Sequence, residues 1–177
     1  MDIREFVKLS IGRWRSQRSG HNLAFSHFEE VRSTIDIVSL AGSDGSVIEL
    51  CKSAGIDPAA AISPFSMSWE GQSDWDEEET MVGSCVLVPI PDRDNINQGK
   101  LLRSQGYAET IAAVGDYYFT SDGTFVLLTE YDRAAAEERI WFATDNLRFR
   151  VSLIKTSDGQ GVVTASFASE IRSLSGN

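Results

Sequence analysis

The chain has little sulfur chemistry and no long apolar segment. Its two cysteines, Cys51 and Cys85, belong to no CxxC pair and to no cluster with zinc-ligand spacing, and its histidines are His21 and His27. We therefore predict no metal site, and we expect both cysteines to be small buried residues. No apolar run approaches the roughly 20 residues that span a bilayer, so no membrane contact is expected.

Positive charge is also scarce. Sixteen basic residues are set against 26 acidic ones, and the net charge of −10 argues against nucleic-acid binding, which needs a basic surface. All but four of the basic residues are arginine, a bias that favours planar, two-point recognition of carboxylates. The first residues, MDIREFV, resemble neither a secretory signal nor a transit peptide, which predicts a cytoplasmic protein.

Common enzymatic motifs are missing as well. The sequence contains no glycine-rich phosphate loop, no Ser/His/Asp elbow and no HExxH segment. The acidic run 74–79 matches neither a calcium loop nor a glycosidase carboxylate pair, and we interpret it as a solvated rim or a surface that faces a partner. Hydrolysis and nucleotide chemistry are therefore disfavoured.

The apolar spacing near the N-terminus predicts two short helices. Asp2 is suited to cap an amphipathic helix that runs to about Lys8, and an extended segment begins at Gly12. A second helix is expected over 45–54, because Gly55 follows it as a stop signal.

Short strand candidates then recur at close intervals. They cover 66–70, 74–79, 84–90, 100–106, 110–120, 124–131, 138–143, 147–154 and 162–171. This cadence predicts one all-β domain, 1–177, built as an antiparallel sandwich or barrel with short accessory helices. The step from Asp122 to Gly123 indicates a tight hairpin with positive φ angles. The loop 91–99 is the best linker candidate, but strand signals on both sides argue against a domain boundary there.

The stretch 137–152, EERIWFATDNLRFRVS, carries the strongest functional signal. Arg148, Arg150 and Ser152 alternate with apolar residues, so they share one face of a strand, and we interpret the other face as the packing face. Two guanidiniums and a hydroxyl suit a ligand that bears carboxylates. The alternative is a face exposed to water, which is the commoner environment of arginines on strands. Burial inside a barrel would instead imply function, because unpaired buried charges are costly.

The turn at 144–146 decides which residues join the arginine face. A three-residue loop pairs Glu138 with Ser152 and places the carboxylate beside the arginines. A two-residue loop places Arg139 and Trp141 there instead, because a slip of one residue exchanges the two faces of a strand. The sequence alone does not choose between these registers.

Aromatic and sulfur side chains around an expected turn form a second candidate group. Met67, Trp69 and Trp75 offer flat or polarisable surfaces for a conjugated ligand, and the two indoles are expected to be cross-strand neighbours. Filling a core is the alternative, since indole is usually mostly buried. Arg18 is placed to guard a barrel mouth or to meet an anion, and a solvated strand end explains it almost equally well.

Several separated segments resemble the CpcS/CpeS, or S-type, phycobiliprotein lyases. These segments are MDIREFV, GRWRSQR, MSWEG, GSCVLVPIP and ERIWFATDNLRFRVS, in family order from residue 1 to about residue 171. The resemblance implies a lipocalin-like antiparallel β-barrel that binds a linear tetrapyrrole, phycocyanobilin or phycoerythrobilin. It also implies attachment of this bilin by a thioether to a cysteine of a phycobiliprotein α or β subunit. The bilin is then a substrate, and no cofactor is expected.

The resemblance also implies roles for individual residues. The catalytic, ligand-handling positions would be Glu138, Arg148 and Arg150, which favours the three-residue loop. Further ligand-binding candidates are Arg18, Met67, Trp69, Trp75 and Ser152. Propionates suit arginines, the conjugated system suits indoles, and protonated pyrrole nitrogens suit a glutamate as counterion. The thiol nucleophile is expected from the acceptor protein, so both cysteines of this chain should be dispensable.

Two other functions fit the same residues. One is a bilin carrier that contributes nothing to attachment, and the other is a lipocalin-type carrier of fatty acids or another hydrophobic anion. A homodimer is expected by analogy with the family. The residues do not distinguish the two bilins, because these share their propionates and ring size.

Overall fold

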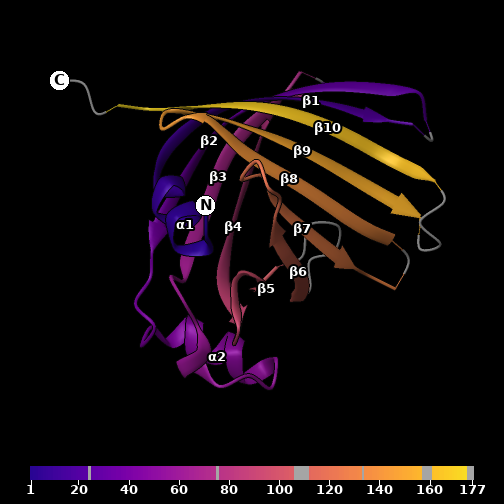
Figure 1. Ribbon diagram of the computed structural model, residues 1–177. Coiled ribbons are helices and arrows are strands. Elements are labelled where there is room, and N and C mark those ends of the chain that lie inside the picture. Colours follow the sequence, from indigo (N-terminus) through magenta and orange to yellow (C-terminus); the bar gives the residue numbers. More distant parts are fainter. Residues whose placement is uncertain (24, 75, 106–111, 133, 157–160, 175–177) are drawn as a thin grey trace.

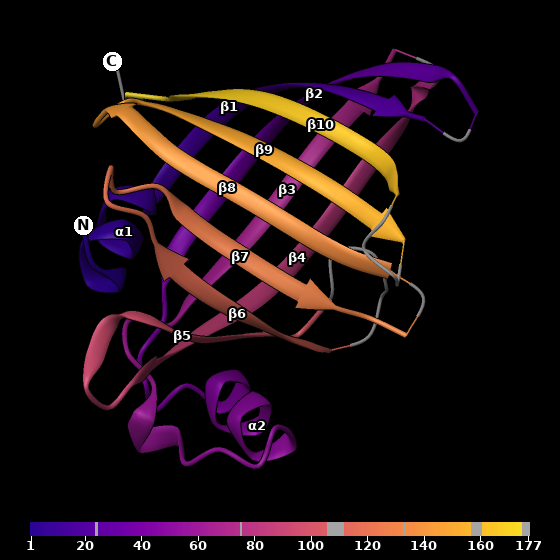
Figure 2. The same ribbon diagram turned by 45° about the vertical axis from the view of Figure 1, so that its right-hand side comes forward.

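The computed structural model describes residues 1–23, 25–74, 76–105, 112–132, 134–156 and 161–174, with the backbone alone for residues 73 and 76–79. The described residues form ten antiparallel strands that close into a barrel (Figures 1 and 2). Each strand pairs with the next one along the chain, and the first pairs with the last. The strands are β1 (Gly12–Asn22), β2 (His27–Ser39), β3 (Phe65–Ser73), β4 (Asp76–Asp92), β5 (Asn95–Arg103), β6 (Ala113–Phe119), β7 (Phe125–Glu130), β8 (Ala134–Thr144), β9 (Leu147–Thr156) and β10 (Val162–Arg172).

This closed antiparallel barrel confirms the fold class that the strand cadence predicts. Closure gives every strand two hydrogen-bonded neighbours, so the sheet has no exposed edge. Among the described residues, no helix is long and apolar enough to cross a membrane.

Helix α1 (Ile3–Ser10) closes one end of the barrel (Figure 2). It begins as predicted, because the Asp2 carboxylate accepts hydrogen bonds from the first-turn backbone, 3.0 Å from the Glu5 nitrogen, and the Glu5 carboxylate accepts one from the Asp2 backbone nitrogen. Its apolar stripe packs into the lumen, where Phe6 stacks on Phe125 with ring centroids 4.3 Å apart. The indole of Trp14 donates a hydrogen bond of 2.9 Å to the carbonyl of Ser10 and ties the helix to β1.

Helix α2 (Gly45–Ser53) lies outside the barrel, against β4 and β5, and a 3₁₀ turn (Pro58–Ala60) follows it (Figure 1). Its buried side chains, Val47, Leu50 and Cys51, pack on Val88 and Leu102. This cluster is separate from the lumen, because inward and outward residues alternate along each strand. The second predicted helix is therefore confirmed, and it covers the outside of the barrel wall and not the lumen.

Three parts of the strand prediction are wrong. Strand β2 had not been predicted as an element separate from the segment that begins at Gly12. The candidate 74–79, from residue 76 onward, and the candidate 84–90 belong to one long strand, β4, whose Asp76 pairs with Ser73 of β3. The linker candidate 91–99 is mostly strand, because β4 and β5 pair up to Asp92 and Asn95 across a two-residue turn.

The hairpin between β6 and β7 is confirmed, but its turn is wider than predicted. Phe119 pairs with Phe125, which leaves five residues between the strands. Only Gly123 of the turn has a positive φ, of 83°. The carboxylate of Asp122 instead accepts hydrogen bonds within the loop, including one of 3.1 Å from the backbone nitrogen of Thr124.

The register of β8 and β9 combines features of both predicted loops. Thr144 pairs with Leu147, so the turn itself has two residues, and a bulge between Phe142 and Thr144 shifts the register by one. Beyond the bulge Glu138 pairs with Ser152, as the three-residue loop predicts. The bulge therefore places the carboxylate on the same face as the arginines.

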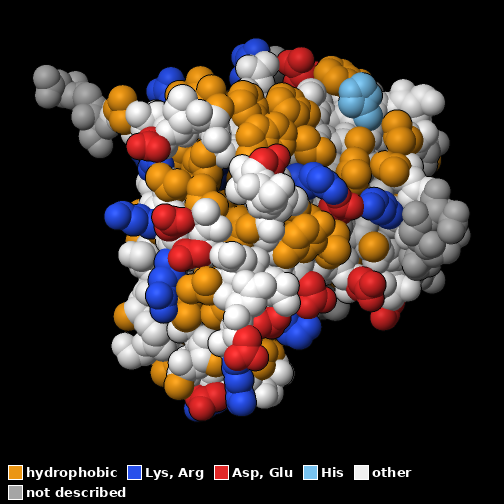
Figure 3. Space-filling view, viewed as in Figure 1, with side chains coloured by type: hydrophobic (Ala, Val, Ile, Leu, Met, Phe, Trp, Pro, Cys, Tyr) orange, Lys and Arg blue, Asp and Glu red, His pale blue; other side chains and the backbone are white. Residues whose placement is uncertain are grey.

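The apolar face of β9 does not pack into the core, contrary to the prediction. The barrel buries the arginine face, and the alternate residues lie outside, where Phe149 sits between Trp141 and Phe167 with ring centroids 5.6 and 5.7 Å away. Phe167 remains 45% exposed and Ile171 59% exposed. We call these residues, with Val151, the outer apolar face, and Figure 3 shows hydrophobic side chains gathered over β9 and β10.

Candidate functional site

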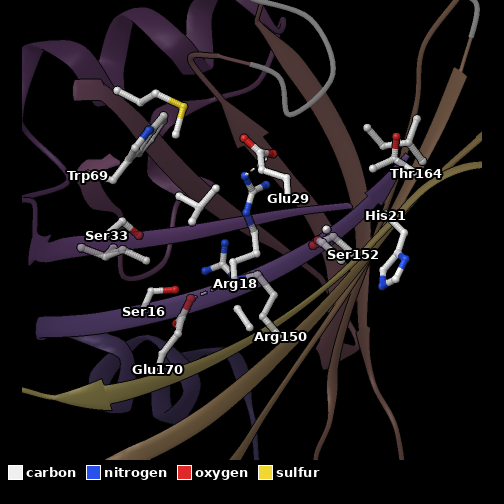
Figure 4. Close-up of a pocket in the computed structure, with 18 of the residues that line it drawn as sticks. Ser16, Arg18, His21, Glu29, Ser33, Trp69, Arg150, Ser152, Thr164 and Glu170 are labelled. Atoms are coloured by element: carbon white, nitrogen blue, oxygen red, sulfur yellow. Dashed lines mark ion pairs between the residues drawn. The ribbon is translucent and has the colours of Figure 1, made fainter. Parts of the chain in front are cut away.

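An open chamber of about 560 Å³ occupies the end of the barrel opposite α1. This volume falls within the range of roughly 300–1,000 Å³ that is usual for small-molecule sites. Its walls come from β1 to β5 and from β9 and β10, so residues far apart in the sequence meet around it (Figure 4). Its lining includes Arg18, Glu29, Met67, Trp69, Arg103, Arg150, Ser152 and Glu170.

Five charged side chains form a layer at the bottom of the chamber, which we call the ion layer: Arg103, Glu138, Arg148, Arg150 and Glu170. Arg103, Arg150 and Glu170 line the chamber itself, whereas Glu138 and Arg148 line a smaller pocket beneath it. Each of the five is at most 16% exposed. Below the layer lie a second pocket of about 40 Å³ and the apolar core around Phe6. A ligand that enters the chamber therefore reaches charge before it reaches the packed interior.

Two predicted arginines hold different positions in this layer. Arg148 is 1% exposed, donates a short hydrogen bond to Glu170, and places its guanidinium carbon 4.5 Å from the centre of the Trp14 ring. Arg150 faces the chamber, with nitrogens 3.7 Å from Glu170 and 3.8 Å from Glu138. Arg150 is therefore the cation of the layer that a ligand meets first, and Arg148 lies behind it.

Sequence reasoning missed the other two members of the ion layer. Glu170, on β10, is directly opposite Arg148 in register and is 1% exposed. Arg103, the last residue of β5, reaches across the lumen to Glu138 with an Nη1 to Oε2 distance of 2.8 Å. A signal for a second buried acid did exist, since two inward arginines require more negative charge than Glu138 alone supplies.

Burial and ion pairing act against each other on these groups. Burial lowers the pKa of Arg148 to about 10, which Glu170 only partly offsets, and the guanidinium remains a cation at neutral pH. Burial raises the pKa of Glu170, but the charges of Arg150 and Arg148 outweigh it and hold the pKa below its usual value. Burial lowers the pKa of Arg103, and the opposing charge of Glu138 and the contact with Cys85 more than reverse this. The layer is therefore charged, with three cations against two anions.

Some buried polar atoms at the site are not satisfied by the protein. Among the described residues, Nη2 of Arg148 and the hydroxyl of Ser152 have no hydrogen-bond partner. Ser152 is 3% exposed and lines the chamber. An unpaired buried donor costs roughly 1–3 kcal/mol, so both atoms favour a polar ligand at this end of the barrel.

The remaining predicted residues fall on the chamber walls, with one exception. Met67 and Trp69 line the wall formed by β3, where a Cβ atom on Gly83 would lie 2.2 Å from the Trp69 ring. Glycine therefore makes room for the indole, and Trp69 pairs with Gly83 instead of with a second indole. Trp75 lies outside the described residues.

Arg18 lies nearer the mouth, as predicted. Its side chain is 38% exposed, and its guanidinium is 3.8 Å from the Glu29 carboxylate on β2 (Figure 4). The pair is partly hydrated, so it holds Arg18 only weakly. A second anionic group of a ligand can therefore reach a cation without entering the ion layer.

No group of three or more His, Cys, Asp or Glu residues lies close enough to hold a metal in the part of the chain that the structure describes. Cys51 and Cys85 are both buried and free, as predicted. The arrangement suits binding and orientation: one excess positive charge at the floor, a second cation near the mouth, and an indole and a thioether between them.

Comparison with known proteins places this chamber in a family. The model of the CpeS-like protein family matches residues 2–173. The chain is 73% identical to chromophore lyase CpcS/CpeS 3 of Trichodesmium erythraeum, over 98% of this chain and 100% of that protein. It is 61% identical to a Microchaete diplosiphon protein provisionally named phycoerythrobilin lyase CpeS, over 89% of this chain and 71% of that protein.

A solved structure supports the same assignment. The S-type phycobiliprotein lyase CPES from Guillardia theta superposes with a TM-score of 0.87 at 51% identity, over 99% of this chain and 95% of that one. Sequence and fold therefore agree along almost the whole chain. The chain belongs to the CpeS-like family of chromophore lyases.

Proposed function

We propose that the chain binds phycoerythrobilin in the open chamber and attaches it to a cysteine of a phycobiliprotein subunit. The observation that carries the proposal is the ion layer beneath a chamber walled by Trp69 and Met67. Buried charges of this kind are costly, and a ligand with carboxylates and pyrrole nitrogens offers partners to both signs. The relative provisionally named for phycoerythrobilin supports this bilin over phycocyanobilin.

Each part of the bilin has a partner in the chamber or directly beneath it. One propionate pairs with Arg150 at the floor, and the other pairs with Arg18 near the mouth. Glu138 acts as the counterion of the protonated pyrrole nitrogens, and Trp69 stacks on the conjugated system. Arg148 fixes Glu170, and Glu170 in turn holds Arg150 in place. Ser152 donates its unused hydroxyl hydrogen to the ligand.

The attachment itself needs little chemistry from the lyase. The acceptor's thiol adds to the exocyclic double bond of the A-ring: an S–C bond forms, and the thiol proton passes to the adjoining ring carbon, without change of oxidation state. A barrel that presents this ring at its mouth converts an undirected addition into an oriented one. The bilin is a substrate, and we propose that no resident cofactor takes part.

Incubation with each bilin and an apo-phycobiliprotein subunit tests the proposal. The purified chain should bind phycoerythrobilin with a large visible absorbance shift and should direct it to one cysteine faster than spontaneous addition. Unchanged rate and site selectivity would leave a carrier, and displacement of the bilin by fatty acid would indicate a general lipocalin-type carrier. Mass mapping of the modified cysteine identifies the acceptor subunit.

We propose further that the chain forms a homodimer through its outer apolar face. Exposed Phe167 and Ile171 beside the Trp141 and Phe149 rings form a contiguous apolar surface of the kind that marks interfaces. Light scattering tests this, because Phe167→Glu should yield monomers from dimers.

The free cysteines also support our proposal that the protein acts in the cytoplasm, which cell fractionation tests.

A further inference from the structure

Arg103 is a charged residue in an otherwise apolar wall. Its inward neighbours on β4 and β5 are Leu87, Cys85 and Leu101, all of them in the buried core. The whole residue is 5% exposed. A guanidinium in such surroundings is unfavourable unless an acid compensates it, so its place in the barrel calls for an explanation.

Its partner lies on a strand that is not adjacent in the sheet. Arg103 ends β5 and Glu138 is on β8, with β6 and β7 between them in the barrel order. The 2.8 Å contact from Arg103 Nη1 to Glu138 Oε2 therefore spans the lumen and is not a pair between neighbouring strands. Both side chains are 7% exposed, so water screens this contact little.

The contact fixes which oxygen of Glu138 faces Arg150, the arginine that lines the chamber. Oε2 accepts from Arg103, and Oε1 is directed toward Arg150, at 3.8 Å. Arg103 borders both the open chamber and the smaller pocket below it, so it lies at the boundary that a ligand must approach. Without Arg103, the Glu138 carboxylate would lose its nearest cation and the contact that sets its orientation.

We propose that Arg103 is a positioning residue that holds Glu138 as an oriented carboxylate, and thereby determines the colour and affinity of the bound bilin. The inference rests on the proposed function of the chamber. It assigns Arg103 an action through Glu138, which presents Oε1 to the pyrrole nitrogens. The pigment then reports on the contact, because its visible absorption depends on the charge beside its pyrrole rings.

The test compares Arg103→Met, Arg103→Lys, Glu138→Gln and the double variant Arg103→Met with Glu138→Gln, each titrated with phycoerythrobilin. Arg103→Met should weaken binding roughly tenfold to hundredfold, as expected for a lost charge-assisted hydrogen bond, and should shift the absorbance maximum in the same direction as Glu138→Gln. Arg103→Lys keeps the charge without the planar fork and should give an intermediate spectrum.

The double variant distinguishes positioning from direct contact. If Arg103 acts through Glu138, the double variant should match Glu138→Gln alone in affinity and spectrum, because the single losses do not add. Fully additive losses, or a wild-type spectrum in Arg103→Met, would overturn the proposal. Circular dichroism checks that each variant folds. If Arg103→Met does not fold, the spectrum and affinity of Arg103→Lys test the proposal instead. Failure of the wild-type chain to bind bilin would instead refute the proposed function.

Discussion

Removal of Arg148 should reveal how strongly the ion layer constrains the barrel. Arg148→Met leaves Glu170 buried at 1% exposure, with Arg150 at 3.7 Å as its remaining cation in the layer. Breaking a buried pair from one side costs about 3–5 kcal/mol, since an uncompensated charge is left behind. The melting temperature of a chain of this length should then fall by roughly 6–12 °C for a loss of about 3 kcal/mol.

The loss of stability in Arg148→Met should depend on whether its partner, Glu170, is still charged. The double variant Arg148→Met with Glu170→Leu removes both charges, and we expect it to recover about 2 kcal/mol relative to the sum of the single losses. Urea denaturation followed by tryptophan fluorescence measures the free energy of unfolding of the wild type, of Arg148→Met, of Glu170→Leu and of the double variant. Arg13→Met serves as a control, because its pair with Asp36 is exposed and should contribute nothing resolvable. Losses that simply add in the double variant would show that Arg148 and Glu170 do not stabilise each other.

Other predictions follow from individual contacts. Gly83→Val should displace the Trp69 indole and abolish most bilin binding at a cost of about 1–3 kcal/mol, visible as altered tryptophan fluorescence; unchanged binding would show that the indole is not held there. Replacing Cys51 and Cys85 together by alanine should leave chromophore transfer intact, and loss of transfer in a folded variant would contradict an external nucleophile. A hydrogen bond from Lys155 lowers the pKa of Glu137 below its ordinary 4.5, so this group's contribution to stability should vanish as the pH falls below that value. Glu137→Gln should flatten the acid side of the stability profile, and an unaltered profile would contradict this.

The alternation of polar and apolar residues along the strands made the barrel predictable from the sequence, together with the members of the site on β8 and β9. The period of two placed Arg148, Arg150 and Ser152 on one face, and the Glu138 register followed from one of two weighed loops. The bulge at 143 was not predictable, because it returns a two-residue turn to the pairing of a three-residue loop. A bulge of this kind depends on the tilt and closure of the whole sheet.

Hydrophobicity did not predict which side chains of β9 and β10 face the lumen and which face outward. Phe167 and Ile171 look like core residues and lie outside, whereas Glu170 looks like a surface residue and is buried. The barrel inverts the usual preference here because its lumen holds the charged side chains of the ion layer. Arg103 was missed because it follows Leu101 and Leu102 and reads as the polar end of a strand. Its partner on β8 is apparent only when the barrel is closed.

A crystal structure of the chain with phycoerythrobilin would show where the pigment lies relative to the ion layer. We expect the pigment inside the open chamber, with one carboxylate bonded to Arg150 and its pyrrole nitrogens facing Glu138. Bilin bound on the outer surface of the barrel, with the ion layer untouched beneath an empty chamber, would contradict the account.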